Sequence, residues 1–160
     1  MGSEFGQTEE WNNDLSLNWD LLRHADHAGL SRLVGDLNEL YQSHEFLAAG
    51  DSVADKFRWL ECGQQEESVF SFLRFGDSSA ETLLAAFNFS GKSLNEHRMG
   101  VPCEGPWKCL VHSLDKSYAG PLDAQLLEPH AEAVASGDWE FSLSLDLPAS
   151  CGVLLAPEAP

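Results

Sequence analysis

The chain has 160 residues, enough for one domain or one domain with a fragment attached, and 43% of them are hydrophobic, which is typical of a globular protein. Asp and Glu number 26 against 9 Lys and Arg, giving a net charge of -17. This balance argues against nucleic acids and anionic membranes as partners, because both attract basic surfaces. No run of about 18 apolar residues is present, so we expect no membrane span. The acidic, polar N-terminus does not have the form of a signal peptide.

The first regular element that the sequence predicts is an amphipathic helix over residues 30–41. Its apolar residues recur at the i, i+3, i+4, i+7 spacing that places them on one helix face, and they are Leu30, Leu33, Val34, Leu37, Leu40 and Tyr41. Asp26 is a candidate capping residue just before this stripe. We expect His24 and His27, which precede the helix, to lie on the surface.

Short strand-like runs separated by turn-rich pieces follow the helix. They are "FRWLEC" (57–62), "SVFSFLRF" (68–75), "TLLAAFNF" (82–89), "EHRMGV" (96–101), "WKCLVH" (107–112), "DWEFSLSLDL" (138–147) and "CGVLLA" (151–156). Residues 122–137 have no regular pattern and are expected to form a long loop. This number of short strands with frequent turn signals predicts a mainly β protein, an antiparallel β-sandwich preceded by an N-terminal helical segment.

The aromatic residues of these strands are expected to differ in exposure. Trp139 alternates with Phe141 and Leu143 and should lie in the core, whereas Trp59 should be half-buried. Trp107 follows a turn at the start of a strand. We therefore identify Trp107 as the best candidate for a surface aromatic that contacts a sugar, although packing is the commoner role of such a residue.

The four cysteines are Cys62, Cys103, Cys109 and Cys151, and none forms a CxxC pair. A chain of this length with a full core does not need a disulfide framework, so we expect free thiols, a cytoplasmic location and no zinc site. The pattern indicates no metal and no other cofactor. His112, Ser113 and Asp115 do not predict a catalytic triad, because adjacent strand residues point to opposite faces.

The opening stretch "MGSEFGQTEEWN" admits two interpretations: Gly-Ser-Glu-Phe after an initiator Met could be an expression scar, or it could be native. Together with "SLNWDLL", "RLVGDLNELY", "FRWL", "SVFSFLRF", "NFS", "HRMGVP" and "SLSLDLP", in this order, the stretch resembles the C-terminal part of the 1,4-α-glucan (glycogen) branching enzymes of the α-amylase superfamily. Members of that family carry Met-Gly-x-Glu-Phe-x-Gln shortly before Glu-Trp-Asn. The resemblance therefore favours the native interpretation.

The resemblance implies that residues 1–45 end a catalytic (β/α)8 barrel and that residues 46–160 form the C-terminal all-β sandwich. The catalytic carboxylates of the family would lie upstream, so no residue here is assigned a catalytic role and the chain alone should be inactive. Glu4, Gln7 and Trp11 would lie at the rim of the barrel site near the glucan, or would only brace the loop and the domain junction. With the neighbouring barrel strands absent, Phe5, Trp11 and Trp19 are expected to find little to bury against except the helix over residues 30–41.

The expected function is accordingly structural. The sandwich would cover one side of the barrel in cis and could contact α-glucan such as glycogen or amylose. Two alternatives remain open at this point: a stand-alone carbohydrate-binding β-sandwich, or the C-terminal domain of a debranching or trehalose-releasing member of the superfamily.

Overall fold

The computed structural model describes residues 1–44, 47, 53–62, 68–78 and 81–158. Its longest helix is α1 (Ala25–Ser43). The strands are β1 (Phe57–Cys62), β2 (Val69–Phe75), β3 (Thr82–Asn88), β4 (Leu94–Val101), β5 (Gly105–His112), β6 (His130–Ala131), β7 (Phe141–Leu147) and β8 (Cys151–Pro157). Short 3-10 helices are η1 (Ser3–Phe5), η2 (Trp19–Arg23), η3 (Ala54–Lys56), η4 (Lys116–Tyr118) and η5 (Ala124–Leu126).

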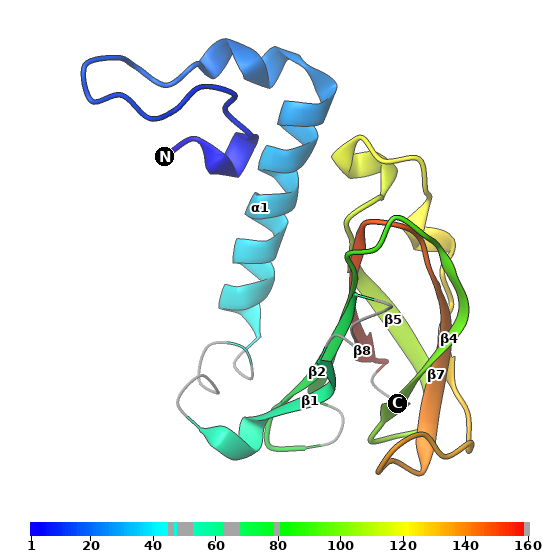
Figure 1. Cartoon of the computed structure of the whole chain (residues 1–160). Helices are drawn as coiled ribbons and strands as arrows, with labels where there is room; N and C mark the ends of the chain where they lie inside the picture. Colours follow the sequence, from blue (N-terminus) through cyan, green and yellow to red (C-terminus); the bar gives the residue numbers. More distant parts are fainter. Residues whose placement is uncertain (45–46, 48–52, 63–67, 79–80, 159–160) are drawn as a thin grey trace.

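The strands form two layers that face each other (Figure 1). One layer is a six-stranded sheet in the order β1-β2-β3-β8-β5-β6, and the other is the pair β4-β7. All of the strand pairings are antiparallel. The chain also belongs to the mainly β class in its described residues, which confirms the sandwich that the alternating pattern predicted.

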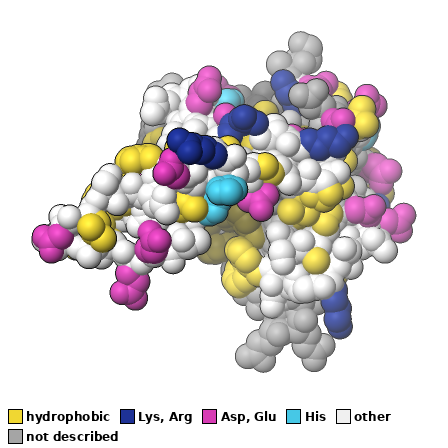
Figure 2. Space-filling view, turned by 90° about the horizontal axis from the view of Figure 1, so that it is seen from above, with side chains coloured by type: hydrophobic (Ala, Val, Ile, Leu, Met, Phe, Trp, Pro, Cys, Tyr) yellow, Lys and Arg dark blue, Asp and Glu magenta, His cyan; other side chains and the backbone are white. Residues whose placement is uncertain are grey.

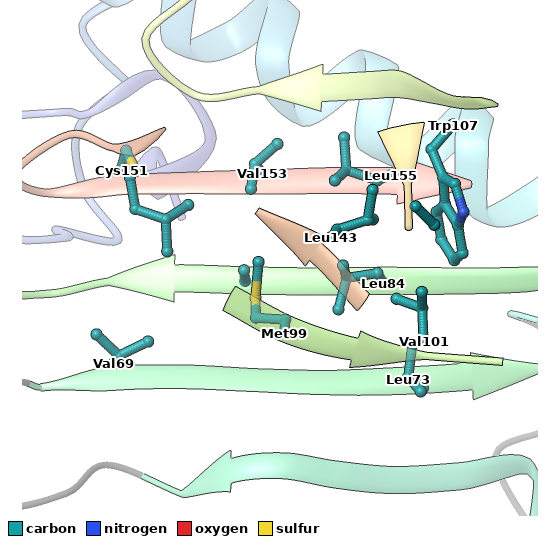
Figure 3. Packing of buried hydrophobic residues seen from close by; sticks show 13 residues of the cluster. Val69, Leu73, Leu84, Met99, Val101, Trp107, Leu143, Cys151, Val153 and Leu155 are labelled. Carbon is teal, nitrogen blue, oxygen red and sulfur yellow. The ribbon is translucent and has the colours of Figure 1, made fainter. Parts of the chain in front are cut away.

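The core lies between the two layers because each strand turns its apolar side chains inward. In β2, the buried residues Val69, Ser71 and Leu73 alternate with Phe70 and Phe72, which lie on the opposite face. Figure 3 shows Leu73, Leu84 and Leu155 of the large sheet against Met99, Val101 and Leu143 of the small one. Burying each such side chain contributes about 1.5–3 kcal/mol.

Helix α1 begins five residues earlier than the apolar stripe predicted. Asp26 is not its cap: His24 occupies the N-cap position without a side-chain cap bond, and Asp26 lies in the first turn, where a negative charge favours the helix dipole. No helix within the described ranges is long and apolar enough to cross a bilayer.

Helix α1 is docked to the sandwich through η4. Gly29 is buried there, and a Cβ at this position would lie 2.4 Å from the carbonyl oxygen of Tyr118, so only glycine permits the close approach. The Tyr118 hydroxyl donates to Oδ2 of Asp36 at 2.7 Å, and the Arg32 guanidinium donates to the carbonyl of Ser117. Burial and the Asp36 carboxylate raise the pKa of Tyr118 to about 12, so the hydroxyl keeps its proton and the bond persists at ordinary pH.

The strand predicted over residues 138–147 is shorter in the structure. β7 starts at Phe141, so Trp139 precedes it, in the turn that leads into the strand. Trp139 is half-buried at the edge of the core, not within it. Ser142 falls on the polar side of the alternation but is buried as well, and its hydroxyl donates to the carbonyl of Val134 at 2.6 Å. A hydrogen-bonded serine can be buried on the face that the alternation pattern assigns to solvent.

Candidate functional site

The N-terminal segment folds into two tight turns that end at Gln7. Gly2 and Gly6 adopt positive φ angles of 88° and 69°, a conformation that side-chain-bearing residues rarely adopt. The carbonyl of Gly2 accepts hydrogen bonds from the backbone N–H groups of Phe5 and Gln7. This geometry gives the opening stretch a defined structure of its own and directs the Phe5 side chain away from that of Glu4, which is exposed.

Phe5 anchors this segment on the start of α1. Its side chain is 1% exposed and its ring lies 5.1 Å from the ring of Trp19, centroid to centroid. The carbonyl of Phe5 lies 2.8 Å from Nδ1 of His27 in the helix, which donates to it. Phe5 thus lies against the start of the helix, as expected, but it is buried more fully than expected because the intervening chain also brings Trp19 over it. Trp11 and Trp19 remain 58% and 56% exposed, as expected.

The three predicted rim residues differ in exposure and in hydrogen bonding. Gln7 is half-buried and braces the loop: its Oε1 accepts from the backbone N–H of Asn18 at 3.0 Å, and its Nε2 donates to the carbonyl of Glu9 at 3.2 Å. Glu4 and Trp11 are exposed and leave their polar and aromatic groups accessible. Gln7 thus holds the loop that presents Trp11.

The surface placement of Trp107 is wrong. Its side chain is 1% exposed and belongs to the core cluster between the two sheets (Figure 3). Its backbone N–H donates to the carbonyl of Pro129, which draws the irregular 122–137 segment over this end of the sandwich. The indole Nε1 is buried without a hydrogen-bond partner among the described residues. The position of Trp107 at a strand start beside a turn predicted an exposed side chain. The segment that covers this end of the strand is distant in sequence, so the local pattern does not reveal it.

The outer face of the large sheet carries a row of exposed and half-exposed aromatic rings. This row was not predicted from the sequence. We call this row the aromatic face; it consists of Phe57, Trp59, Phe70, Phe72, Phe87 and Phe89. Neighbouring ring centroids lie between 5.1 and 6.2 Å apart. Trp59 is 49% and Phe89 67% exposed. The signal was present, since these aromatics occupy the strand positions that alternate with core residues.

The aromatic face lies on the same side of the large sheet as α1. Gly152 of β8 leaves room there for the Phe87 ring, because a Cβ at Gly152 would lie 2.9 Å from Cδ1 of that ring. Between α1 and β5 lies a cavity of about 280 Å³, lined by Leu40 and Tyr118 among others. Figure 2, seen from above, shows hydrophobic side chains around the hollow between the part of the molecule with α1 and the sandwich. This side of the molecule therefore combines exposed aromatic rings with a cavity that Asp36, Glu39 and Lys108 also line.

Two titratable groups that follow or end β5, His112 and Asp115, hold the adjoining turns together. Asp115 accepts hydrogen bonds from the side chain and backbone of Ser117 and from the backbone of Ala124, and these hold its pKa below the usual value. Burial lowers the pKa of His112, whose Nδ1 accepts from the backbone N–H of Leu114. Within the described ranges, no three His, Cys, Asp or Glu side chains are grouped so that they could hold a metal ion.

Comparisons with known proteins agree with this architecture. The profile of the family described as "Alpha amylase, C-terminal all-beta domain" matches residues 59–158. The chain is 38% identical over 148 residues to the 1,4-alpha-glucan branching enzyme GlgB of Aquifex aeolicus, covering 92% of this chain and 24% of that protein. It is 40% identical over 159 residues to the protein of the same name from Pseudomonas putida, covering 99% of this chain and 21% of that protein. The chain therefore spans about a fifth to a quarter of the length of these curated relatives.

Proposed function

The chain belongs to the alpha amylase C-terminal all-beta domain family, and from this premise we propose that it is the C-terminal part of a 1,4-α-glucan branching enzyme. The observation that carries the proposal is the extent of the similarity: at 40% identity it covers 99% of the chain and so reaches the N-terminal segment as well as the sandwich. A similarity confined to the sandwich would fit any enzyme that ends in such a domain. The branching enzyme would act in the cytoplasm.

In this proposal the chain supports catalysis and does not perform it. Branching requires one carboxylate that attacks the anomeric carbon and a second carboxyl group, about 5 Å away, that acts as acid and then as base. A hydroxyl of a second glucan chain then takes the place of water as the acceptor. None of the acidic side chains described above is arranged in this way. The catalytic pair is assigned to the part of the protein outside this chain.

The division that we propose places residues 1–45 with a catalytic (β/α)8 barrel and residues 46–160 in the sandwich. Support comes from apolar side chains of the N-terminal segment and α1 that remain exposed, which are Trp11, Leu15, Trp19, Leu37 and Tyr41. Exposed apolar groups of this density are characteristic of a surface that a protein partner covers. The barrel in cis is that partner, and it would cover the aromatic face as well.

Trp11 and Glu4 are the two residues that we propose for contact with glucan at the rim. The hydrogens on the face of a glucose ring pack well on an exposed indole, while its hydroxyls point sideways and can donate to a carboxylate. Gln7 has a positioning role, since both the oxygen and the nitrogen of its side-chain amide are engaged within the loop.

Loss of iodine-complex absorbance by amylose tests this function directly. The full-length protein should lower the absorbance, whereas residues 1–160 alone should not, because the catalytic pair is missing from them. In the full-length protein, Trp11→Ala should lower branching, and Leu126→Ala should leave it unchanged, since Leu126 is 77% exposed on the sandwich. Activity of the isolated chain above the buffer control, or a full-length protein that only hydrolyses amylose, would contradict the proposal.

A further inference from the structure

A groove opens between the edge strand β1 and the small sheet, and its lining reaches the aromatic face at one residue, Trp59. Its volume is about 310 Å³. It is lined by residues 58–61 of β1, residues 98–100 of β4 and residues 136–139 of the turn before β7. Three segments distant in sequence thus converge on one concavity of a size that suits a small ligand.

Arg58, Asp138 and Trp139 form one wall of this groove. The Arg58 guanidinium is ion-paired with Oδ2 of Asp138 at 2.5 Å and lies over the Trp139 ring, 5.3 Å from its centroid. The indole is held from behind by Phe75, with ring centroids 6.0 Å apart. Gly100 makes room for it, because a Cβ there would lie 2.5 Å from Cδ1 of Trp139. These contacts fix the positions of a donor, an acceptor and an aromatic ring before any ligand binds.

The opposite wall is held in place by similar contacts. The Arg98 guanidinium donates to Oγ of Ser142 at 2.8 Å and to Oε2 of Glu132 at 3.2 Å. Glu61 accepts from Nε2 of His97 at 2.9 Å, and this hydrogen bond holds the pKa of Glu61 below its usual value. Glu61 is therefore a carboxylate at neutral pH and can accept further hydrogen bonds.

The charges that line the groove cancel. Arg58 and Arg98 carry one positive charge each, and Glu61 and Asp138 carry one negative charge each. The whole chain has a net charge of -17, which repels phosphates and other anions. A groove without net charge offers no strong site for a free cation either. Its donors and acceptors instead suit a neutral ligand that both gives and takes hydrogen bonds.

We propose that this groove binds a neutral oligosaccharide, and, resting on the proposed function for the identity of the sugar, that the ligand is an α-1,4-linked glucan chain. A sugar hydroxyl donates to a carboxylate and accepts from a guanidinium at the same time, which matches the Arg58–Asp138 pair. The Trp139 indole has Arg58 over one face and Phe75 against the other, so its role is to hold the guanidinium in position for this contact. The site would hold a glucan strand on the sandwich, apart from the rim residues of the N-terminal segment.

Calorimetric titration of residues 1–160 with maltoheptaose tests the proposal. We expect saturable binding by the unchanged chain. Arg58→Met keeps the apolar stem over Trp139 but removes the charged donors, and Asp138→Asn keeps the shape but removes the charge. Each should weaken binding by about tenfold, the effect of losing a hydrogen bond to a charged group. Trp139→Phe, which keeps an aromatic ring against Phe75, should weaken it as well. Unaltered thermal unfolding confirms that each variant is folded.

Phe89→Ala is the matched control, because Phe89 is an exposed ring of the aromatic face and does not line the groove. It should bind maltoheptaose as the unchanged chain does. The proposal is overturned if the unchanged chain shows no saturable binding, or if the groove variants are folded and bind normally. It is equally overturned if Phe89→Ala alone abolishes binding, which would place the sugar on the aromatic face. None of these results bears on branching by the full-length protein, so a failure of the groove and a failure of the proposed function are distinguishable.

Discussion

Replacing Trp107 should lower the stability of the sandwich far more than replacing Trp59 does, although both are tryptophans in strands. Trp107 is 1% exposed within the core cluster, and Trp59 is 49% exposed on the aromatic face. Truncating a fully buried tryptophan to alanine costs about 3–5 kcal/mol, from lost transfer energy and the cavity left behind. Because 1 kcal/mol shifts the melting temperature of a domain of this size by about 2–4 °C, Trp107→Ala should lower it by roughly 6–20 °C.

Trp59→Ala should cost about 1–2 kcal/mol, since about half of its side chain is already in water. Trp107→Phe gives a second, independent check. The buried Nε1 of Trp107 has no hydrogen-bond partner among the described residues, and leaving such a group unpaired costs about 1–3 kcal/mol. Phenylalanine removes that penalty while it loses part of the ring, so its effect should be much smaller than that of alanine. Thermal and urea unfolding followed by circular dichroism measure all three. A melting temperature that falls as far for Trp59→Ala as for Trp107→Ala would refute the assignment of Trp107 to the core.

Three further predictions concern the docked helix, acid stability and the thiols. Gly29→Ala should loosen the packing of α1 on η4 and so speed amide hydrogen exchange in the helix. Gly35→Ala, whose Cβ would meet no atom within 4 Å, should instead stabilise the chain by about 0.5–1 kcal/mol, and faster amide exchange in this variant would contradict the prediction. The lowered pKa of Asp115 stabilises the fold above the unfolded pKa of roughly 4, and this contribution is lost as the pH falls through the folded pKa, so Asp115→Asn should flatten the acid limb of a stability curve. Burial raises the pKa of the Cys109 thiol to about 11. In a Cys62→Ser background, Cys109 should therefore react more slowly with a disulfide reagent at pH 8 than Cys103 does, and equal reaction rates would contradict this prediction.

The strands could be predicted from the sequence because each carries a local alternation. In β2, the apolar and small residues Val69, Ser71 and Leu73 face the core, and the period of two alone places them on one side. What alternation does not state is which side is the core. Phe70 and Phe72 are more hydrophobic than Ser71, yet they lie on the outer face and Ser71 is buried, where its hydroxyl donates to Glu61.

The candidate site was harder to predict because its geometry depends on contacts between distant segments. Phe5 is buried by Trp19, which lies fourteen positions later and is brought back by the loop that Gln7 closes onto Asn18. Trp107 is covered by a segment that follows it by about twenty residues. No periodic pattern encodes either contact. The groove likewise joins Arg58 to Asp138 across 80 positions, and neither residue stands out from its sequence neighbours.

The alternation of β1 also separates the two surfaces that the chain offers to other molecules. Arg58 and Trp59 are consecutive, so their side chains leave the strand on opposite faces: Arg58 reaches Asp138 and Trp139 between the layers, and Trp59 packs on Phe72 outside. The outer surface carries a row of aromatic rings in contact with one another, which suits a protein partner. In the inner groove Arg58 is paired with Asp138 and Arg98 with Glu132, and Glu61 accepts from His97, which suits a neutral polar ligand. Trp59 belongs to both surfaces, because it also lines the groove, so a barrel that covers the outer face would meet the groove at this one residue while Arg58, Asp138 and Trp139 stay on the inner side.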